Sequence, residues 1–171
     1  KVKGTPVSIT GLSSMAIRTA DNFNFDEDDF NSKVSYTHQL LIARKVSDKL
    51  SLQLAPTWVH RNKVLDTQQN EVLALGVGGR VKLNQRISLN TEYYYRLTDE
   101  QAPFKDSFGV GMEIETGGHV FHLQFTNSRS MVERGFITET YGDFLGGDIH
   151  FGFNISRVFK KCQKSVEEKL Y

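Results

Sequence analysis

The sequence lacks the residues that mark several classes of protein. Its 171 residues include one cysteine, Cys162, which excludes an internal disulfide and a redox pair of cysteines. The 21 Lys and Arg nearly balance the 20 Asp and Glu, so the chain has no overall charge for binding nucleic acid. No run approaches the roughly 18 consecutive apolar residues of a membrane-spanning helix. The chain starts at Lys1 without a charged and then apolar leader, and we expect either a removed signal peptide or a start inside a longer protein.

What the sequence does have is alternation of apolar and polar residues in eight stretches. Leu50, Leu52 and Leu54 share one face of such a stretch, whereas Ser51 and Gln53 share the other. Alternation of this kind is typical of a strand with one apolar and one polar face. Each stretch has the roughly 9–11 residues with which a tilted strand crosses a bilayer. The predicted strands are 6–19, 33–46, 49–62, 71–83, 86–98, 106–116, 119–129 and 148–159.

The links between these strands alternate in length. Three are tight, at 47–49, 84–86 and 117–118. Four are longer, at about 20–32, 63–70, 99–105 and 130–147. All long links therefore fall at one end, as in outer-membrane barrels with short periplasmic turns and long outer loops. The pattern predicts an all-β fold, an antiparallel up-and-down transmembrane β-barrel with eight strands in this chain, in a bacterial outer membrane with both termini periplasmic.

Hairpin register tests which face is which, because a slip of one residue sends every side chain to the opposite face. A two-residue turn at 117–118 places Glu113 opposite His122 and Met112 opposite Leu123. The three-residue turns likewise predict the pairs Ile42–Leu54, His38–Trp58, Arg80–Asn90 and Leu75–Tyr95. In the 117–118 hairpin polar residues oppose polar ones and apolar residues oppose apolar ones, and all three hairpins close with consistent faces.

A few residues depart from ideal strand composition. Pro56 removes a ladder hydrogen bond in mid-strand, and we predict a bulge there. Leu12 and Leu41 fall on the otherwise polar face. Six glycines in the predicted strands are expected to allow curvature of the barrel wall rather than to line a ligand path. These glycines are Gly76, Gly78, Gly79, Gly109, Gly111 and Gly152.

The last predicted strand reads DIHFGFNISRVF (148–159), alternating, rich in aromatic residues and ending in Phe, like a C-terminal outer-membrane insertion signal. Further motifs are YTHQLLIARKVSDKLSLQLAPTWVHRN (36–62), LNTEYYY (89–95), ETGGHVFHLQFTNS (115–128) and GFITET (135–140). With these motifs the chain resembles, over about residues 8–159, a family of uncharacterised outer-membrane β-barrels from Bacteroidota-type bacteria. The resemblance implies no activity for any residue.

Members of that family look longer at the N-terminus by several strands. The resemblance therefore implies that residues 1–159 form the C-terminal part of a barrel of about twelve strands. The remaining residues, 160–171, are expected to be a periplasmic tail. With four more strands the lumen would be wider than that of a narrow eight-stranded barrel filled by side chains.

The candidate site consists of polar side chains on the inward face. Glu113 and His122 are predicted to lie opposite each other, with Glu115 nearby and His150 on the next strand. A carboxylate that orients an imidazole is the core of many acid–base sites. No positioned nucleophile accompanies this pair, so we expect a network of hydrogen bonds and ion pairs in the lumen and no catalytic residue. The expected network contains Arg80, Glu92, Arg96, Glu113, Glu115, His122 and His150.

No cofactor or metal site is expected. His119 and His122 point to opposite faces of one strand and cannot chelate together. The acidic segment FNFDEDDF (23–30) lacks the ligand spacing of an EF-hand, so a solvated outer loop is expected in place of a Ca²⁺ site. The longest link, 130–147, mixes aromatic and charged residues. It suits a plug in the barrel mouth and an ordinary surface loop equally well.

We expect a non-enzymatic outer-membrane barrel, a pore, transport component or structural barrel, in contact with membrane lipid. If the lumen is open, the excess of Arg and Lys over Glu on the inward face favours small anionic solutes as partners. Two alternatives stay open. One is a membrane-embedded lipid-modifying enzyme that uses the Glu113–His122 pair, and the other is a soluble lipocalin-like binder whose Leu, Phe and Tyr face would point inward.

Overall fold

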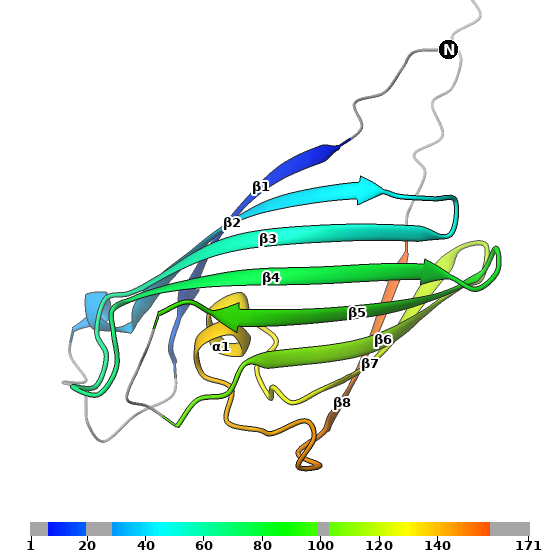
Figure 1. Ribbon diagram of the computed structural model, residues 1–171. Helices are drawn as coiled ribbons and strands as arrows, with labels where there is room; N and C mark the ends of the chain where they lie inside the picture. The colour runs from blue at the N-terminus through cyan, green and yellow to red at the C-terminus, as the bar shows by residue number, and fades with distance from the viewer. Residues whose placement is uncertain (1–6, 20–28, 99–102, 158–171) are drawn as a thin grey trace, which may run out of the picture.

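The protein folds into one curled antiparallel sheet (Figure 1). The computed structural model describes residues 7–19, 29–98 and 103–157. The strands are β1 (Ser8–Ile17), β2 (Val34–Lys45), β3 (Leu50–Arg61), β4 (Glu71–Lys82), β5 (Ile87–Arg96), β6 (Ser107–Glu115), β7 (His119–Thr126) and β8 (His150–Arg157). A 3₁₀ turn, η1 (Phe30–Lys33), precedes β2, and a short helix, α1 (Glu133–Thr138), lies between β7 and β8. The all-β, up-and-down architecture predicted from the sequence is confirmed.

The strands pair in the order of the sequence, β1 to β8. Within the described residues β1 pairs with β2 alone and β8 with β7 alone. The sheet is therefore a half-barrel with two open edges. The total of about twelve strands stays a prediction. The acidic segment at 23–28, Phe159 and the tail at 160–171 lie outside the described residues.

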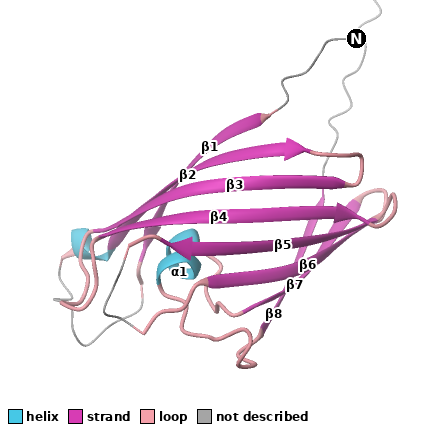
Figure 2. Ribbon diagram, in the orientation of Figure 1, coloured by secondary structure: helices cyan, strands magenta, loops and turns pink. Residues whose placement is uncertain are grey.

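The three tight turns lie together at one end of the sheet and the long links at the other (Figure 2). The first residue of β1 and the last of β8 lie at the turn end, since Ser8 is opposite Ala43 and Arg157 is opposite His119. Side chains explain why the turns form where they do. Ser47 Oγ accepts from the backbone N–H groups of Lys49 and Leu50, and Asn84 Oδ1 accepts from the two corresponding groups of its own turn, as polar turn residues commonly do.

The strand pairing confirms the register predicted for all three hairpins. Glu113 lies opposite His122, and Met112 opposite Leu123. The other two hairpins contain the predicted pairs Ile42–Leu54, His38–Trp58, Arg80–Asn90 and Leu75–Tyr95. At the last turn Gly117 adopts a φ of 63°, a left-handed conformation that suits glycine.

The bulge predicted at Pro56 is wrong. β2 and β3 keep one register on both sides of the proline, from Gln39–Thr57 to Ile42–Leu54, whereas a bulge inserts an extra residue and shifts the register. The assigned pairing skips only the positions between those two pairs. A proline has no N–H to donate, so the ladder loses a bond locally without bending around an extra residue. On the other side, Pro56 pairs normally with Leu75 of β4.

The apolar face of the sheet points outward. Large apolar side chains on this face are strongly exposed, for example Leu54 at 47% and Phe153 at 50%. In a soluble apolar-ligand binder these residues would face the interior, so the lipocalin-like alternative does not fit. The exposed outward residues from β3 to β8 include Leu52, Trp58, Leu73, Val77, Leu89, Tyr93, Tyr95, Phe125, Phe151 and Ile155.

The buried apolar core is small and lies on the concave side. Ile137 of α1 is fully buried there against a patch of β3, β4 and β5. Leu41 and Phe136 pack against this cluster, which explains why Leu41 departs from the polar pattern of its face. The long link 130–147 therefore places its helix on the concave side of the sheet (Figure 1), so this part of the link is not an ordinary surface loop. The other members of the cluster are Ala55, Val59, Val72, Ala74 and Tyr94.

Two adjacent residues of β3 test the assignment of faces. We expect Leu54→Arg to destabilise the protein in lipid vesicles by about 2–4 kcal/mol, because it places a guanidinium in the hydrocarbon. Gln53→Arg places the same side chain on the concave polar face and should leave stability nearly unchanged. Denaturant unfolding of both variants in vesicles measures the difference, and equal destabilisation would contradict the orientation.

Candidate functional site

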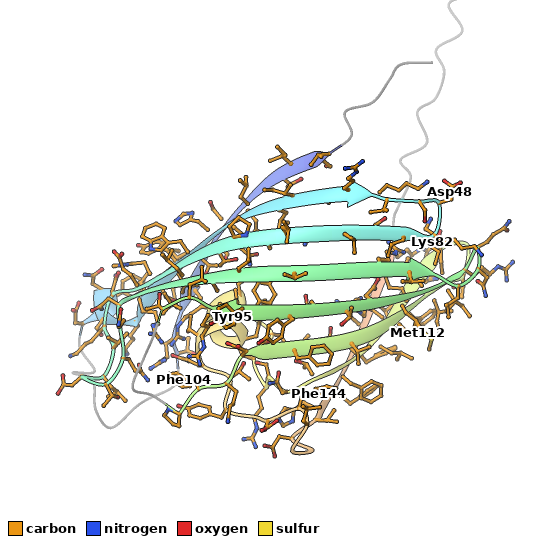
Figure 3. All side chains as sticks on the ribbon, viewed as in Figure 1. Asp48, Lys82, Tyr95, Phe104, Met112 and Phe144 are labelled. Atoms are coloured by element: carbon orange, nitrogen blue, oxygen red, sulfur yellow. The ribbon has the colours of Figure 1, made fainter. Side chains whose placement is uncertain are left out.

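The concave face holds a polar cavity of about 670 Å³ between α1 and the short turns. In Figure 3, Asp48 and Lys82 mark the turn end, and Phe104 marks the end with the long links. Phe136 of α1 and Met131 close the cavity on the side of the helix. The rest of the lining is mainly polar and includes Arg80, Asn90, Glu92, Glu113, His122, Gln124 and Asn154.

Three of the residues predicted from the sequence meet in this cavity. Glu113 Oε2 lies 2.5 Å from Arg80 Nη2, and Glu113 Oε1 lies 3.8 Å from His122 Nδ1. The same Arg80 nitrogen donates to Ser88 Oγ at 3.2 Å. The separation of Glu113 from His122 is longer than a hydrogen bond, so the carboxylate is held mainly by the arginine. Glu113 and Arg80 thus neutralise each other in an ion pair on the concave face.

The other predicted residues are distributed along the wall. Glu92 lines the same cavity. Glu115 is exposed at the turn end, opposite Val120. His150 lies opposite Thr126, at the far end of β7 from the turn, and does not join Glu113 and His122. The register of β7 and β8 decides this, because it places Asn154 opposite His122.

Arg96 belongs to the end with the long links. Its Nη2 donates to the carbonyl oxygen of Phe104 at 2.6 Å, and its guanidinium carbon lies 5.7 Å from the centre of the Phe104 ring. Its Nε lies 3.7 Å from Asp106 Oδ1. Arg96 therefore ties the segment before β6 to the inside of β5, away from the cavity.

The inward glycines make room for side chains of neighbouring strands. A Cβ on Gly76 would lie 2.6 Å from the Tyr94 ring, and one on Gly152 would lie 2.7 Å from Gln124 Nε2. A Cβ on Gly111 would lie 3.0 Å from His122 Nε2. None of the six glycines singled out in the sequence has a positive φ. At Gly76, Gly111 and Gly152 the missing side chain thus leaves room for inward side chains of the neighbouring strands. Gly78, Gly79, Gly109 and Gly111 line the cavity.

A second charged cluster, which the sequence did not predict, lies where α1 meets the wall. Glu139 Oε1 lies 3.0 Å from Arg18 Nη2 and 3.8 Å from Arg61 Nη1, and it also pairs with Arg134. Arg61 is only 2% exposed, and its Nη2 donates to the carbonyl oxygen of Gln69 at 2.5 Å. One carboxylate of the long link thus meets guanidiniums from β3, from the end of β1 and from α1. We call these four residues the Glu139 cluster.

Burial lowers the pKa of the Arg134 guanidinium, and the attraction of Glu139 opposes that shift. Arginine ordinarily titrates far above neutral pH, so the cluster is an ion-pair network at pH 7. The signal for it in the sequence was the inward position of Arg18 and Arg61, which need a counter-charge. What the sequence could not supply was the path of residues 130–147, which brings Glu139 to them.

Within the described residues, no group of three or more His, Cys, Asp or Glu is arranged to hold a metal ion. No helix in the described ranges is long and apolar enough to cross a membrane. Near the Glu113–His122 pair, the Ser88 hydroxyl accepts a hydrogen bond from Arg80. The cavity therefore offers polar binding groups and an ion-pair network.

Two glycines on the same face of β4 test the role of the close contacts. Gly76→Ala should destabilise the protein by about 1–3 kcal/mol, because the added methyl group overlaps the Tyr94 ring. Gly78→Ala is the matched control, since its nearest neighbours would lie 3.7 Å away. Thermal or denaturant unfolding of both variants gives the comparison. If the two substitutions cost the same, packing of Tyr94 over Gly76 is not the reason for the glycine.

The Glu139 cluster is tested by removing its one carboxylate. Glu139→Gln leaves three arginines without their shared counter-charge, and we expect a loss of about 3 kcal/mol in unfolding free energy. Asp48→Asn removes an exposed carboxylate that pairs with Lys45 at 2.8 Å and should leave the unfolding midpoint unchanged. A midpoint for Glu139→Gln equal to that of the wild type would contradict a structural role for the cluster.

Comparison with known proteins agrees with this architecture. Residues 1–159 match the model of the family described as "Membrane bound beta barrel domain (DUF5777)". No curated protein and no solved structure matches the chain. The apolar outward face and polar concave face are those expected of a sheet whose outside meets lipid. The chain therefore belongs to the DUF5777 family of membrane-bound β-barrel domains.

Proposed function

We propose that this domain forms part of an outer-membrane barrel without catalytic function, and that α1 closes its lumen at the end with the long links. The observation that carries the proposal is the position of α1 on the concave face, where Ile137 is fully buried. The long links would face the outside of the cell, and the turns and both termini the periplasm, as is usual for outer-membrane barrels.

Three kinds of contact hold the plug, defined here as residues 130–147. Apolar contacts come from Ile137 and from Phe136, whose ring meets Tyr94 edge-on at 5.2 Å. The Glu139 cluster supplies the ion pairs. The third kind of contact is a backbone hydrogen bond, which the Lys105 N–H donates to the Thr140 carbonyl oxygen at 2.7 Å. With these contacts the plug is packed against the concave wall and is not a loosely attached surface loop.

Beyond the plug, the polar cavity provides a vestibule on the turn side. Its lining offers hydrogen-bond donors and acceptors from Asn90, Gln124 and Asn154. These groups suit small polar solutes that enter from the periplasm. The proposed activity is thus a porin-like passage whose outer end is closed until the plug moves.

The ion pairs on the concave face affect which charge of solute the passage prefers. The excess of inward Arg and Lys favours small anionic solutes. In the structure Arg80 pairs with Glu113, Arg96 with Asp106, and both Arg18 and Arg61 with Glu139. These acids compensate much of the positive charge, so we propose a weak preference for anions.

A lipid-modifying enzyme built on Glu113 and His122 is the less favoured candidate. Arg80 holds the Glu113 carboxylate at 2.5 Å, which leaves it a poorer partner for orienting the imidazole. The pair also faces the polar cavity rather than the apolar outer surface where lipid chains would lie.

Conductance in planar bilayers tests the plug. For the full-length protein we expect low conductance, and a much higher conductance when residues 131–139 are replaced by a short Gly-Ser linker. Glu139→Gln should raise the open probability, whereas Glu115→Gln, at the exposed turn end, should not. Reversal potentials across a KCl gradient then measure the preference for anions.

Two results would rule out this function. If the linker variant inserts but conducts no more than the wild type, the barrel is not a passage. If the wild type already conducts as well as the linker variant, α1 does not close it.

A further inference from the structure

One carboxylate in the lining of the polar cavity has no basic partner. Glu113 in the same lining pairs with Arg80. Glu92 of β5 is exposed in this cavity, and it makes no hydrogen bond or ion pair with the part of the chain that the structure describes. It interacts electrostatically with His122, but no arginine or lysine of the described ranges neutralises it. The Glu92 carboxylate is therefore available to a solute.

Glu92 sets the charge that a solute meets in the cavity. Apart from His122, the charged residues of the lining are Arg80, Glu92 and Glu113. Arg80 and Glu113 neutralise each other at 2.5 Å. The Arg80 nitrogen of that pair also bonds Ser88 Oγ, and the register places Ser88 and Glu113 on the turn side of Arg80, away from Glu92. With His122 counted as neutral, the lining thus carries one uncompensated negative charge.

The space beside Glu92 is open because glycines flank it on both neighbouring strands. The register places Gly78 of β4 and Gly109 of β6 opposite Glu92. A Cβ on Gly109 would lie 3.4 Å from Glu92 Oε1, so the carboxylate lies close to that glycine. The nearest neighbours of a Cβ on Gly78 would lie 3.7 Å away, which leaves ordinary room on that side. A solute can therefore reach the carboxylate over Gly78.

The other polar groups around Glu92 are mostly neutral. The amides of Gln53, Asn90 and Gln124 and the hydroxyl of Thr126 line the cavity. Gln53 and Thr126 belong to the same row across the sheet as Glu92. Amides and hydroxyls both donate and accept hydrogen bonds, so they suit the hydroxyl groups of a solute. A carboxylate bonds a charged ammonium group more strongly than it bonds a neutral donor.

We propose that the cavity binds a small hydroxylated amine, with its ammonium group on Glu92 and its hydroxyl groups on the neighbouring amides and hydroxyls. The cavity volume of about 670 Å³ lies within the range of small-molecule sites. This inference rests on the proposed function, because it names the class of solute that the vestibule binds. Glu92 acts on a solute bound beside it, whereas the weak preference for anions concerns the net charge of the whole lumen.

Three solutes that share one polyol chain test the site. At neutral pH glucamine carries an ammonium group at one end of the chain, where sorbitol carries a hydroxyl and gluconate a carboxylate. Their binding to full-length protein in detergent micelles is measured by isothermal titration calorimetry. We expect the wild type to bind glucamine about tenfold more tightly than sorbitol, because of the charge-assisted hydrogen bond to Glu92. Gluconate should bind least tightly.

Three variants locate the site. Glu92→Gln keeps the shape of the side chain and removes its charge, so the affinity for glucamine should fall about tenfold and that for sorbitol should hardly change. The matched control is Glu115→Gln, which removes the same charge from β6 at a position that does not line the cavity, and both affinities should stay unchanged. Gly78→Leu fills the space beside Glu92 and should weaken the binding of both solutes.

Several outcomes would overturn the proposal. Equal affinities of the wild type for glucamine and sorbitol, or equal losses in Glu92→Gln and Glu115→Gln, would show that Glu92 binds no ammonium group. Tighter binding of gluconate than of glucamine would refute the proposed class of solute. Binding is measured without transport, so the two proposals fail separately. Glucamine that binds through Glu92 in a protein whose linker variant does not conduct would refute the passage and keep the site.

Discussion

The hydrogen-bonded register of the antiparallel sheet is the constraint on which the rest of this protein depends. In a lipid environment each backbone N–H and C=O needs a partner within the protein, and the ladder supplies it from β1 to β8. Because side chains alternate along a strand, one register also sends most of the large apolar residues outward and most of the charged residues inward. Even Pro56, which removes one bond, leaves the register of β2 and β3 unchanged.

The interior follows from that constraint. A concave wall lined with charged and amide side chains cannot close on itself as an apolar core does, and the described residues solve this in two ways. At one end, α1 supplies Ile137 to a small apolar cluster and Glu139 to the arginines of the wall. At the other end, Arg80 and Glu113 neutralise each other across a cavity. The same polar face therefore becomes a filled end and an open vestibule.

The outer surface has its own organisation. Most of it is an apolar band, in which Ser13, His38 and Trp58 lie side by side across three strands next to a shallow hollow. The glycine and the proline that create the hollow have different physical effects, since Gly11 removes a side chain and Pro56 removes a backbone donor. Their effects combine only because register places both of them next to Leu40.

Much of this architecture was predictable because it is local. The apolar–polar alternation of stretches such as 50–58 and the tight turns at 47–49, 84–86 and 117–118 specify strands, faces and hairpin pairs within short segments, and the structure confirms them. The facing of Glu113 and His122 followed from the same local geometry. The prediction of a bulge at Pro56 was wrong because a strand can lose a hydrogen bond without an extra residue.

What the tertiary structure alone decided involves segments far apart in the chain. Alternation put Leu41 on the inward face but could not show that it packs against the cluster with α1, that Glu139 pairs with Arg18 and Arg61, or that Tyr94 covers Gly76. His150 likewise was placed away from His122 only by the pairing of β7 with β8. The sequence by itself determined the strands, their faces and their order, since these depend on neighbours along the chain. The path of a long link and the contacts across a curved sheet depend on packing in three dimensions, which no local pattern encodes.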